Sequence, residues 1–210
     1  GCSLGCNVVL NTNTNPYNKV GQARAYRYFP RENKAVNDYW MCDEGRYSFH
    51  AIDDNRVKEP LAAGAPLTLA DAVNQAAEAL KAGLAKGPEQ VAFLLSPQMT
   101  NEELYAFQWL AAQLGVTQVE VGDDLKAMGT ADDYLIQADK NPNSRGAVDL
   151  GLAPRAGVLG GQAVIEAAKA GKLAVLLLVG HDLGADAVAV AAKATVIGIH
   201  SHAHVGALAS

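Results

Sequence analysis

The sequence predicts an α/β chain of two modules, a small N-terminal β-hairpin module and a Rossmann-like, doubly wound parallel-sheet module. Residues 1–60 hold all three cysteines and eight of the thirteen aromatic residues, whereas residues 61–210 are rich in alanine, leucine, valine and glycine. In the second region short apolar runs alternate with helical patterns, which is typical of a parallel sheet covered on both faces. We therefore predict one domain at residues 1–60 and another at residues 61–210, joined around residues 59–66.

The first module contains two expected strands, at residues 7–11 and 20–29. Side chains in the second strand alternate with a period of two. The polar, turn-rich stretch at residues 11–18 connects the strands as a hairpin loop. A hairpin that brings its two ends together places Cys6 near Cys42.

The second module alternates expected helices and strands. Thr68 and Thr100 each precede an acidic residue by three positions, which is typical of a helix N-terminus, and their helices run to about Lys81 and Leu114. Further helices are expected at residues 161–170 and 186–193, and strands at residues 91–95, 116–121, 172–179 and 194–199.

Charge and hydropathy exclude several classes of partner. The net charge of −5 argues against nucleic acid, because phosphate binding needs a clustered positive surface. The longest apolar run, Leu173–Val179, is far shorter than the roughly 18 residues of a membrane span. An odd number of cysteines fits poorly with a disulfide framework and favours a reducing, cytoplasmic compartment.

The three cysteines are Cys2, Cys6 and Cys42. Iron–sulfur clusters are held by cysteine thiolates, usually four, with two or three close together and the last one distant. This spacing matches that arrangement but is one ligand short. We expect a fragment that has lost a cysteine three positions before Cys2, upstream of Gly1.

Two alternatives to a cluster remain for these cysteines. A zinc site is the first, with His50 as the only nearby substitute for a fourth ligand, but zinc ligands are usually paired as C-x2-C or C-x4-C. The second is that the cysteines are buried small hydrophobic residues. Their clustering favours metal ligation, and their spacing favours [4Fe–4S] over zinc.

Four stretches of the first module resemble the iron–sulfur segment of the molybdopterin oxidoreductase superfamily: residues 2–7, 29–33, 36–37 and 39–46. More narrowly, they look like the large iron–sulfur subunit, known as the G subunit, of bacterial NADH-quinone oxidoreductase, respiratory complex I. Residues 96–105 and 135–146 look like the α/β domains of the same subunit.

The resemblance implies that Cys2, Cys6 and Cys42 are the second, third and fourth ligands of a [4Fe–4S] cluster. The gap of 35 residues between Cys6 and Cys42 is longer than in the family, and the surplus fits the loop at residues 11–18. Glu44 stands near the position where molybdenum-containing members carry a lysine, and no molybdenum ligand is recognisable. Bound molybdopterin is therefore not expected.

The function that the resemblance implies is electron transfer inside an NADH-quinone oxidoreductase, from NADH towards quinone, with no catalytic or organic-cofactor site in this chain. The implied partners are other subunits of the peripheral arm. The implied location is the cytoplasmic face of the inner membrane, reached through the complex and without membrane insertion. The alternatives are a catalytic molybdopterin oxidoreductase such as a formate dehydrogenase, and a scaffold subunit without a cluster.

Two further motifs are weaker. His200, His202 and His204 alternate after the last predicted strand and could bind a metal, although a loop at the carboxyl end of a parallel strand is favoured. The glycine-rich stretches at residues 157–161 and 180–184 are interpreted as turns. Neither has the G-x-G-x-x-G spacing of a dinucleotide site.

Overall fold

The computed structural model describes residues 1–13, 25–122, 129–153 and 160–202. The chain divides into two compact units. Unit 1 comprises Gly1–Arg56 and Lys126–Pro142, and unit 2 comprises Val57–Leu125 and Asn143–Ser210. A stretch that follows residues 57–125 in sequence thus belongs to the same unit as the cysteines. The division into domains at residues 60 and 61 stays a prediction.

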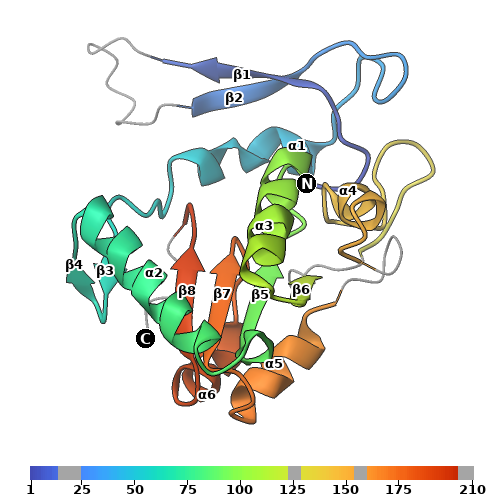
Figure 1. Cartoon of the computed structure of the whole chain (residues 1–210). Coiled ribbons are helices and arrows are strands. Elements are labelled where there is room, and N and C mark those ends of the chain that lie inside the picture. The colour runs from blue at the N-terminus through green and yellow to red at the C-terminus, as the bar shows by residue number, and fades with distance from the viewer. Residues whose placement is uncertain (14–24, 123–128, 154–159, 203–210) are drawn as a thin grey trace. The chain divides into compact units, whose positions relative to one another are not determined.

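Unit 1 is built on the predicted hairpin. Strands β1 (Val8–Thr12) and β2 (Ala25–Pro30) are antiparallel, with Val9 opposite Phe29, and lie alongside one another in Figure 1. The loop was expected at residues 11–18, but β1 continues to Thr12. Residues 14–18 of that loop and residues 20–24 of the expected second strand lie outside the described residues.

Two short helices follow the hairpin in unit 1. Helix α1 (Asp43–Tyr47) leads directly into the 3-10 helix η1 (Ser48–Ile52). The Asp53 carboxylate, just after η1, accepts a hydrogen bond of 2.8 Å from the Ala25 N–H at the start of β2. This bond ties the end of the helical stretch to the hairpin.

Unit 2 contains the predicted parallel sheet, with strand order β6-β5-β7-β8. Its strands are β5 (Val91–Leu95), β6 (Gln118–Val121), β7 (Val175–Val179) and β8 (Thr195–Ile199). Every residue of the two central strands, β5 and β7, is buried. The prediction from continuous apolar runs, a sheet covered on both faces, is confirmed.

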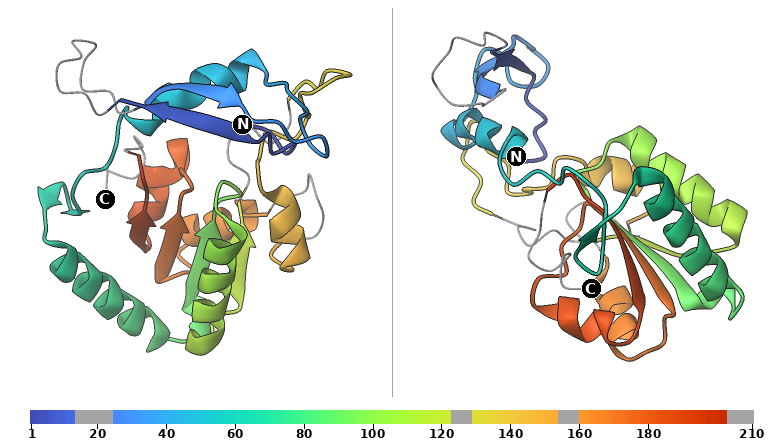
Figure 2. Two further views of the ribbon diagram at one scale, coloured as in Figure 1. Left: turned by 90° about the horizontal axis from the view of Figure 1, so that it is seen from above. Right: turned by 90° about the vertical axis from the view of Figure 1, so that its left-hand side faces the viewer.

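The helices of unit 2 cover the two faces of this sheet, as the right-hand view of Figure 2 shows. Phe93 and Leu95 pack with side chains of α2 and α3, whereas Leu94 packs with α5 and α6. The helices are α2 (Leu69–Leu84), α3 (Asn101–Leu114), α4 (Ser144–Asp149), α5 (Gln162–Lys169) and α6 (Ala187–Ala191). Along the described chain, every helix is too short or too polar to cross a membrane.

Both predicted helix starts are present. The Thr100 side chain accepts from the Glu103 N–H and the Glu103 carboxylate accepts from the Thr100 N–H, a complete capping box. The Thr68 hydroxyl accepts a hydrogen bond of 3.1 Å from the Asp71 N–H. Each cap satisfies a backbone donor that has no partner within the helix.

Several details differ from the sequence prediction, among them the start of β7, which is Val175 rather than residue 172. Strand β6 begins at Gln118 rather than residue 116, because its ladder with β5 starts at the pair Ala92 and Gln118. Residues 61–66, predicted as a linker, form the small hairpin of β3 (Leu61–Ala62) and β4 (Ala65–Pro66). Helix α4 was not predicted, since six residues are too few to show a helical period.

Gly83 allows α2 to approach the sheet, and alanine there should be destabilising. A Cβ atom would lie 2.6 Å from Val175 Cγ2 and 3.0 Å from Val91 Cγ2. Alanine favours a helix over glycine by about 0.5–1 kcal/mol, but overpacking costs about 1–3 kcal/mol. We expect Gly83→Ala to lower the free energy of unfolding of unit 2 by about 1–2 kcal/mol in urea denaturation. Adding Val175→Ala should restore part of this loss, and a more stable Gly83→Ala protein would contradict the packing argument.

Candidate metal centre

Cys2 and Cys6 lie on either side of a turn at the beginning of unit 1. Gly5, within this turn, has a positive φ of 71°, which glycine adopts at little cost. Cys42 is the N-cap of α1, and its Sγ atom accepts a hydrogen bond of 3.3 Å from the Gly45 N–H. All three cysteines are partly exposed free thiols. An N–H donor directed at sulfur stabilises a thiolate, the form that binds metal.

The three predicted ligands influence one another electrostatically. Burial raises the pKa of the Cys6 thiol above its ordinary value, and the nearby Cys2 and Cys42 thiolates raise it further. The repulsion that raises this pKa is consistent with the membership of all three cysteines in unit 1. A soft cation in that region replaces the repulsion with attraction, because metal sites bind cysteine as thiolate.

The two metal alternatives place different demands on the ligands. Within the described residues, no three His, Cys, Asp or Glu side chains converge closely enough to hold a single metal ion. A zinc site needs four ligands on one ion, and the ring of His50 packs against Phe49, with 4.0 Å between ring centroids. In a [4Fe–4S] cluster each cysteine binds a different iron, so the sulfur atoms remain apart. Three cysteine thiolates from two stretches are donors of the kind that hold an iron–sulfur cluster.

Asn37 joins the two cysteine-bearing stretches. Its side chain is buried, at 3% exposure. Oδ1 accepts from the Asn7 N–H at 2.9 Å, next to Cys6, and Nδ2 donates to the Trp40 carbonyl at 2.9 Å, two residues before Cys42. Nδ2 also lies 3.3 Å from the Arg31 carbonyl oxygen. One amide side chain therefore fixes the strand that leaves Cys6 relative to the loop that leads to Cys42.

Residues 129–142, the described part of the second stretch of unit 1, also contact both cysteine-bearing stretches. The Ser3 N–H, next to Cys2, donates to the Asp139 carbonyl at 2.9 Å. Lys140 Nζ lies 4.0 Å from Glu44 Oε2, two residues after Cys42. The sequence analysis grouped residues 135–146 with the α/β domains and missed these contacts, because the segment follows the first half of unit 2 and has no periodic pattern.

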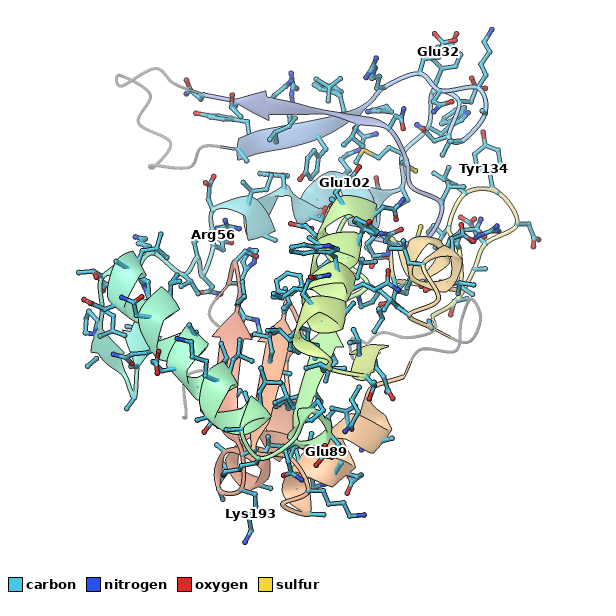
Figure 3. The ribbon with its side chains drawn as sticks, in the orientation of Figure 1. Glu32, Arg56, Glu89, Glu102, Tyr134 and Lys193 are labelled. Atoms are coloured by element: carbon cyan, nitrogen blue, oxygen red, sulfur yellow. The ribbon has the colours of Figure 1, made fainter. Side chains whose placement is uncertain are left out.

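Aromatic contacts belong to the same segment. Tyr134 projects from the loop of residues 129–142, as Figure 3 shows, and its ring meets Trp40 edge to face with 5.9 Å between centroids. Such a pair contributes about 0.5–1.5 kcal/mol beyond its buried area. Both side chains remain more than half exposed, at 68% and 56%. The contact thus fastens segment 129–142 to the loop before Cys42.

The turn at the centre of segment 129–142 depends on the charge of Asp132. Oδ1 accepts the N–H groups of Leu135 and Ile136, both at 2.6 Å, and of Tyr134 at 3.0 Å. These bonds, the one from Leu135 first, lower the pKa of Asp132 below its ordinary value. Because the pKa of Asp132 is lowered on folding, its stabilisation of the turn is complete above the unfolded-state pKa of about 3.9. This stabilisation is lost as pH falls through the lower folded-state pKa.

We therefore expect the Leu135 and Ile136 amide resonances to shift together below about pH 4, measured by NMR. In Asp132→Ala the shared transition should disappear and both amides should exchange faster at neutral pH. Persistence of the same transition in that variant would assign it to another group.

The remaining predicted motifs lie in unit 2. His200 and His202 follow β8, and His204 lies outside the described residues. The His202 ring nitrogen Nδ1 is 2.8 Å from the Ser201 hydroxyl. Gly180 and Gly184 have positive φ values of 65° and 53°, as expected of turns. Part of the stretch at residues 157–161 lies outside the described residues.

Comparison with known proteins identifies relatives of one kind. The G subunit of NADH-quinone oxidoreductase from Pseudomonas fluorescens is 32% identical over 126 residues, which is 59% of this chain and 12% of that protein. The G subunit from Pseudomonas putida is 31% identical, with the same coverage. The chain is related to the G subunit of NADH-quinone oxidoreductase. The Thermus thermophilus protein named NADH-quinone oxidoreductase subunit 3 is 34% identical over 104 residues, 49% of this chain and 12% of that protein.

The resemblance predicted from residues 2–7, 29–33, 36–37 and 39–46 is thus confirmed at the level of the G subunit. The chain spans about an eighth of the length of the curated relatives that it matches. No known protein-family profile matches the chain. The relatives are subunits of an oxidoreductase complex, and the similarity to the G subunit extends over more than half of the chain.

Proposed function

We propose that this chain is an electron-transfer component of an NADH-quinone oxidoreductase, with Cys2, Cys6 and Cys42 as ligands of one [4Fe–4S] cluster. The observation that carries the proposal is that the buried Asn37 side chain ties the stretch after Cys6 to the loop before Cys42, within the unit that also holds Cys2. The similarity to the G subunit supports the assignment of the reaction. Such a cluster supplies one-electron transfer.

Residues around the three cysteines support the binding of such a cluster. Asn37 holds the two cysteine-bearing stretches together, and the Gly45 N–H directs a dipole at the sulfur of Cys42. Hydrogen bonds to ligand sulfur and limited solvent access are the means by which proteins set cluster potentials. The fourth ligand stays a prediction, as does the cysteine expected upstream of Gly1.

The wider role follows from the same proposal. The electrons come from NADH and pass towards quinone, through partner subunits of the peripheral arm at the cytoplasmic face of the inner membrane. No catalytic residue is assigned to this chain. Molybdopterin is not part of the proposal, because Glu44 stands near the position where molybdenum-containing members carry a lysine and no molybdenum ligand is recognisable.

Metal analysis and electron paramagnetic resonance test the proposal on the full-length protein, reconstituted anaerobically with iron and sulfide. We expect about four irons per chain and a cluster signal on reduction with dithionite. Bound molybdenum would instead support a catalytic molybdopterin enzyme. Absence of iron would support a scaffold subunit without a cluster.

A further inference from the structure

Lys140 is a largely buried lysine in the unit that holds the three cysteines. Its side chain is 13% exposed, and Nζ donates a hydrogen bond of 3.2 Å to the Thr130 carbonyl. The ammonium faces two carboxylates: Glu44, at 4.0 Å, and Asp132, whose pKa it helps to lower. Little water screens a charge at this depth, so its field extends further than that of a surface lysine.

Two contacts place Lys140 beside the proposed cluster ligands. Its neighbour Asp139 accepts a backbone hydrogen bond of 2.9 Å from Ser3, the residue after Cys2. Its ion-pair partner Glu44 is two residues after Cys42. The lysine is thus held between the stretches that carry the first and the last of the three cysteines.

The segment is shaped around the side chain of this lysine. A Cβ atom on Gly129 would collide with Lys140 Cε and lie 3.1 Å from Cγ, so a side chain at residue 129 would require the lysine side chain to move. The Gly129 N–H donates to the Ala138 carbonyl at 2.6 Å, which closes the segment behind the stem. A solvated surface lysine needs no such accommodation.

We propose that Lys140 is a positioning residue whose fixed positive charge raises the reduction potential of the iron–sulfur site. The proposal rests on the function proposed above. One-electron reduction adds a negative charge to the site, and a nearby ammonium stabilises that charge. Loss of the ammonium also leaves the negative charges of Glu44 and Asp132 uncompensated. These charges disfavour reduction, so this second effect lowers the reduction potential as well.

A redox titration monitored by electron paramagnetic resonance tests this role on the reconstituted full-length protein. We expect Lys140→Gln to lower the equilibrium constant for one-electron reduction about tenfold, which is about 59 mV. Lys140→Arg, which keeps the charge, should leave the potential close to that of the unsubstituted protein. Lys34→Gln is the matched control, because Lys34 also pairs with a carboxylate, Glu32 at 3.9 Å, but is 80% exposed.

Glu44→Gln provides a second variant if Lys140→Gln loads too little iron to titrate. It removes the opposing carboxylate, so the potential should rise rather than fall. An unchanged potential in a loaded Lys140→Gln protein, or an unchanged or lower potential in Glu44→Gln, overturns the role of Lys140 alone. Absence of iron from the unsubstituted protein overturns the proposed function, and the role of Lys140 with it.

Discussion

Replacing Cys42 with serine is expected to abolish cluster binding while leaving unit 1 folded. Serine is a favoured N-cap residue, and its hydroxyl can accept the Gly45 N–H that now reaches Sγ. The backbone of α1 therefore keeps its cap. The thiolate is lost, however, and a neutral hydroxyl is a poor ligand for iron. The full-length Cys42→Ser protein should retain almost no iron after anaerobic reconstitution and desalting.

Cys42→Ala separates the two roles of this residue. Alanine removes both the ligand and the cap, so the protein should lose iron as the serine variant does and also lose about 1 kcal/mol of stability. Cys6→Ser should lose iron in the same way, because Cys6 is a proposed ligand of the same cluster.

Ser48→Ala is the control for local disturbance of this region. The Ser48 hydroxyl donates to the Gly45 carbonyl at 2.8 Å on the exposed side of α1, so its loss should leave the iron content unchanged. Full iron content in either Cys42→Ser or Cys6→Ser would remove these cysteines from the ligand set.

The sheet of unit 2 was predictable from local pattern. Strands β5 and β7 are continuous apolar runs, and every residue in them is buried. Helix α3, whose N-cap is Thr100, was predictable from a capping box that spans only four residues. The exact strand ends were harder to predict from the sequence. Strand β6 starts where its pairing with β5 begins, and the register of a pair depends on two distant segments.

The candidate site was predictable only in part. The types and spacing of Cys2, Cys6 and Cys42 predict metal ligation, which stays a prediction, and Cys6 and Cys42 belong to one unit, as the hairpin prediction requires. Lys140 gave no such indication, since one lysine in a loop has no periodicity and its ion-pair partner is far away in sequence. Contacts between distant irregular segments leave no local pattern, which is why the second stretch of unit 1 emerges only from the structure.

Replacing Asn37 is expected to have a large effect on the stability of unit 1. Replacing it with leucine leaves a buried side chain of similar size without polar atoms, so the Asn7 N–H and the Trp40 carbonyl lose their partner. A buried polar group without a partner costs about 1–3 kcal/mol. We expect Asn37→Leu to lower the free energy of unfolding of unit 1 by about 3 kcal/mol or more.

Unit 1 can be observed separately because the chain has two tryptophans, Trp40 in unit 1 and Trp109 in unit 2. In a Trp109→Phe background, urea unfolding followed by fluorescence reports Trp40 alone. Asn33→Ala is the matched control, since its side chain accepts a single, exposed hydrogen bond from the Ala35 N–H. Its effect should not exceed about 1 kcal/mol.

Asn37→Asp distinguishes the two halves of this amide. The carboxylate can still accept from the Asn7 N–H, but it cannot donate to the Trp40 carbonyl, and it brings a buried charge against two carbonyl oxygens. We therefore expect this variant to be destabilised as well and to retain less iron, because the loop before Cys42 is released while the strand after Cys6 is held. Full stability and iron content in Asn37→Asp would show that the Asn7 contact alone orders the site and that the link to the Cys42 loop lies elsewhere.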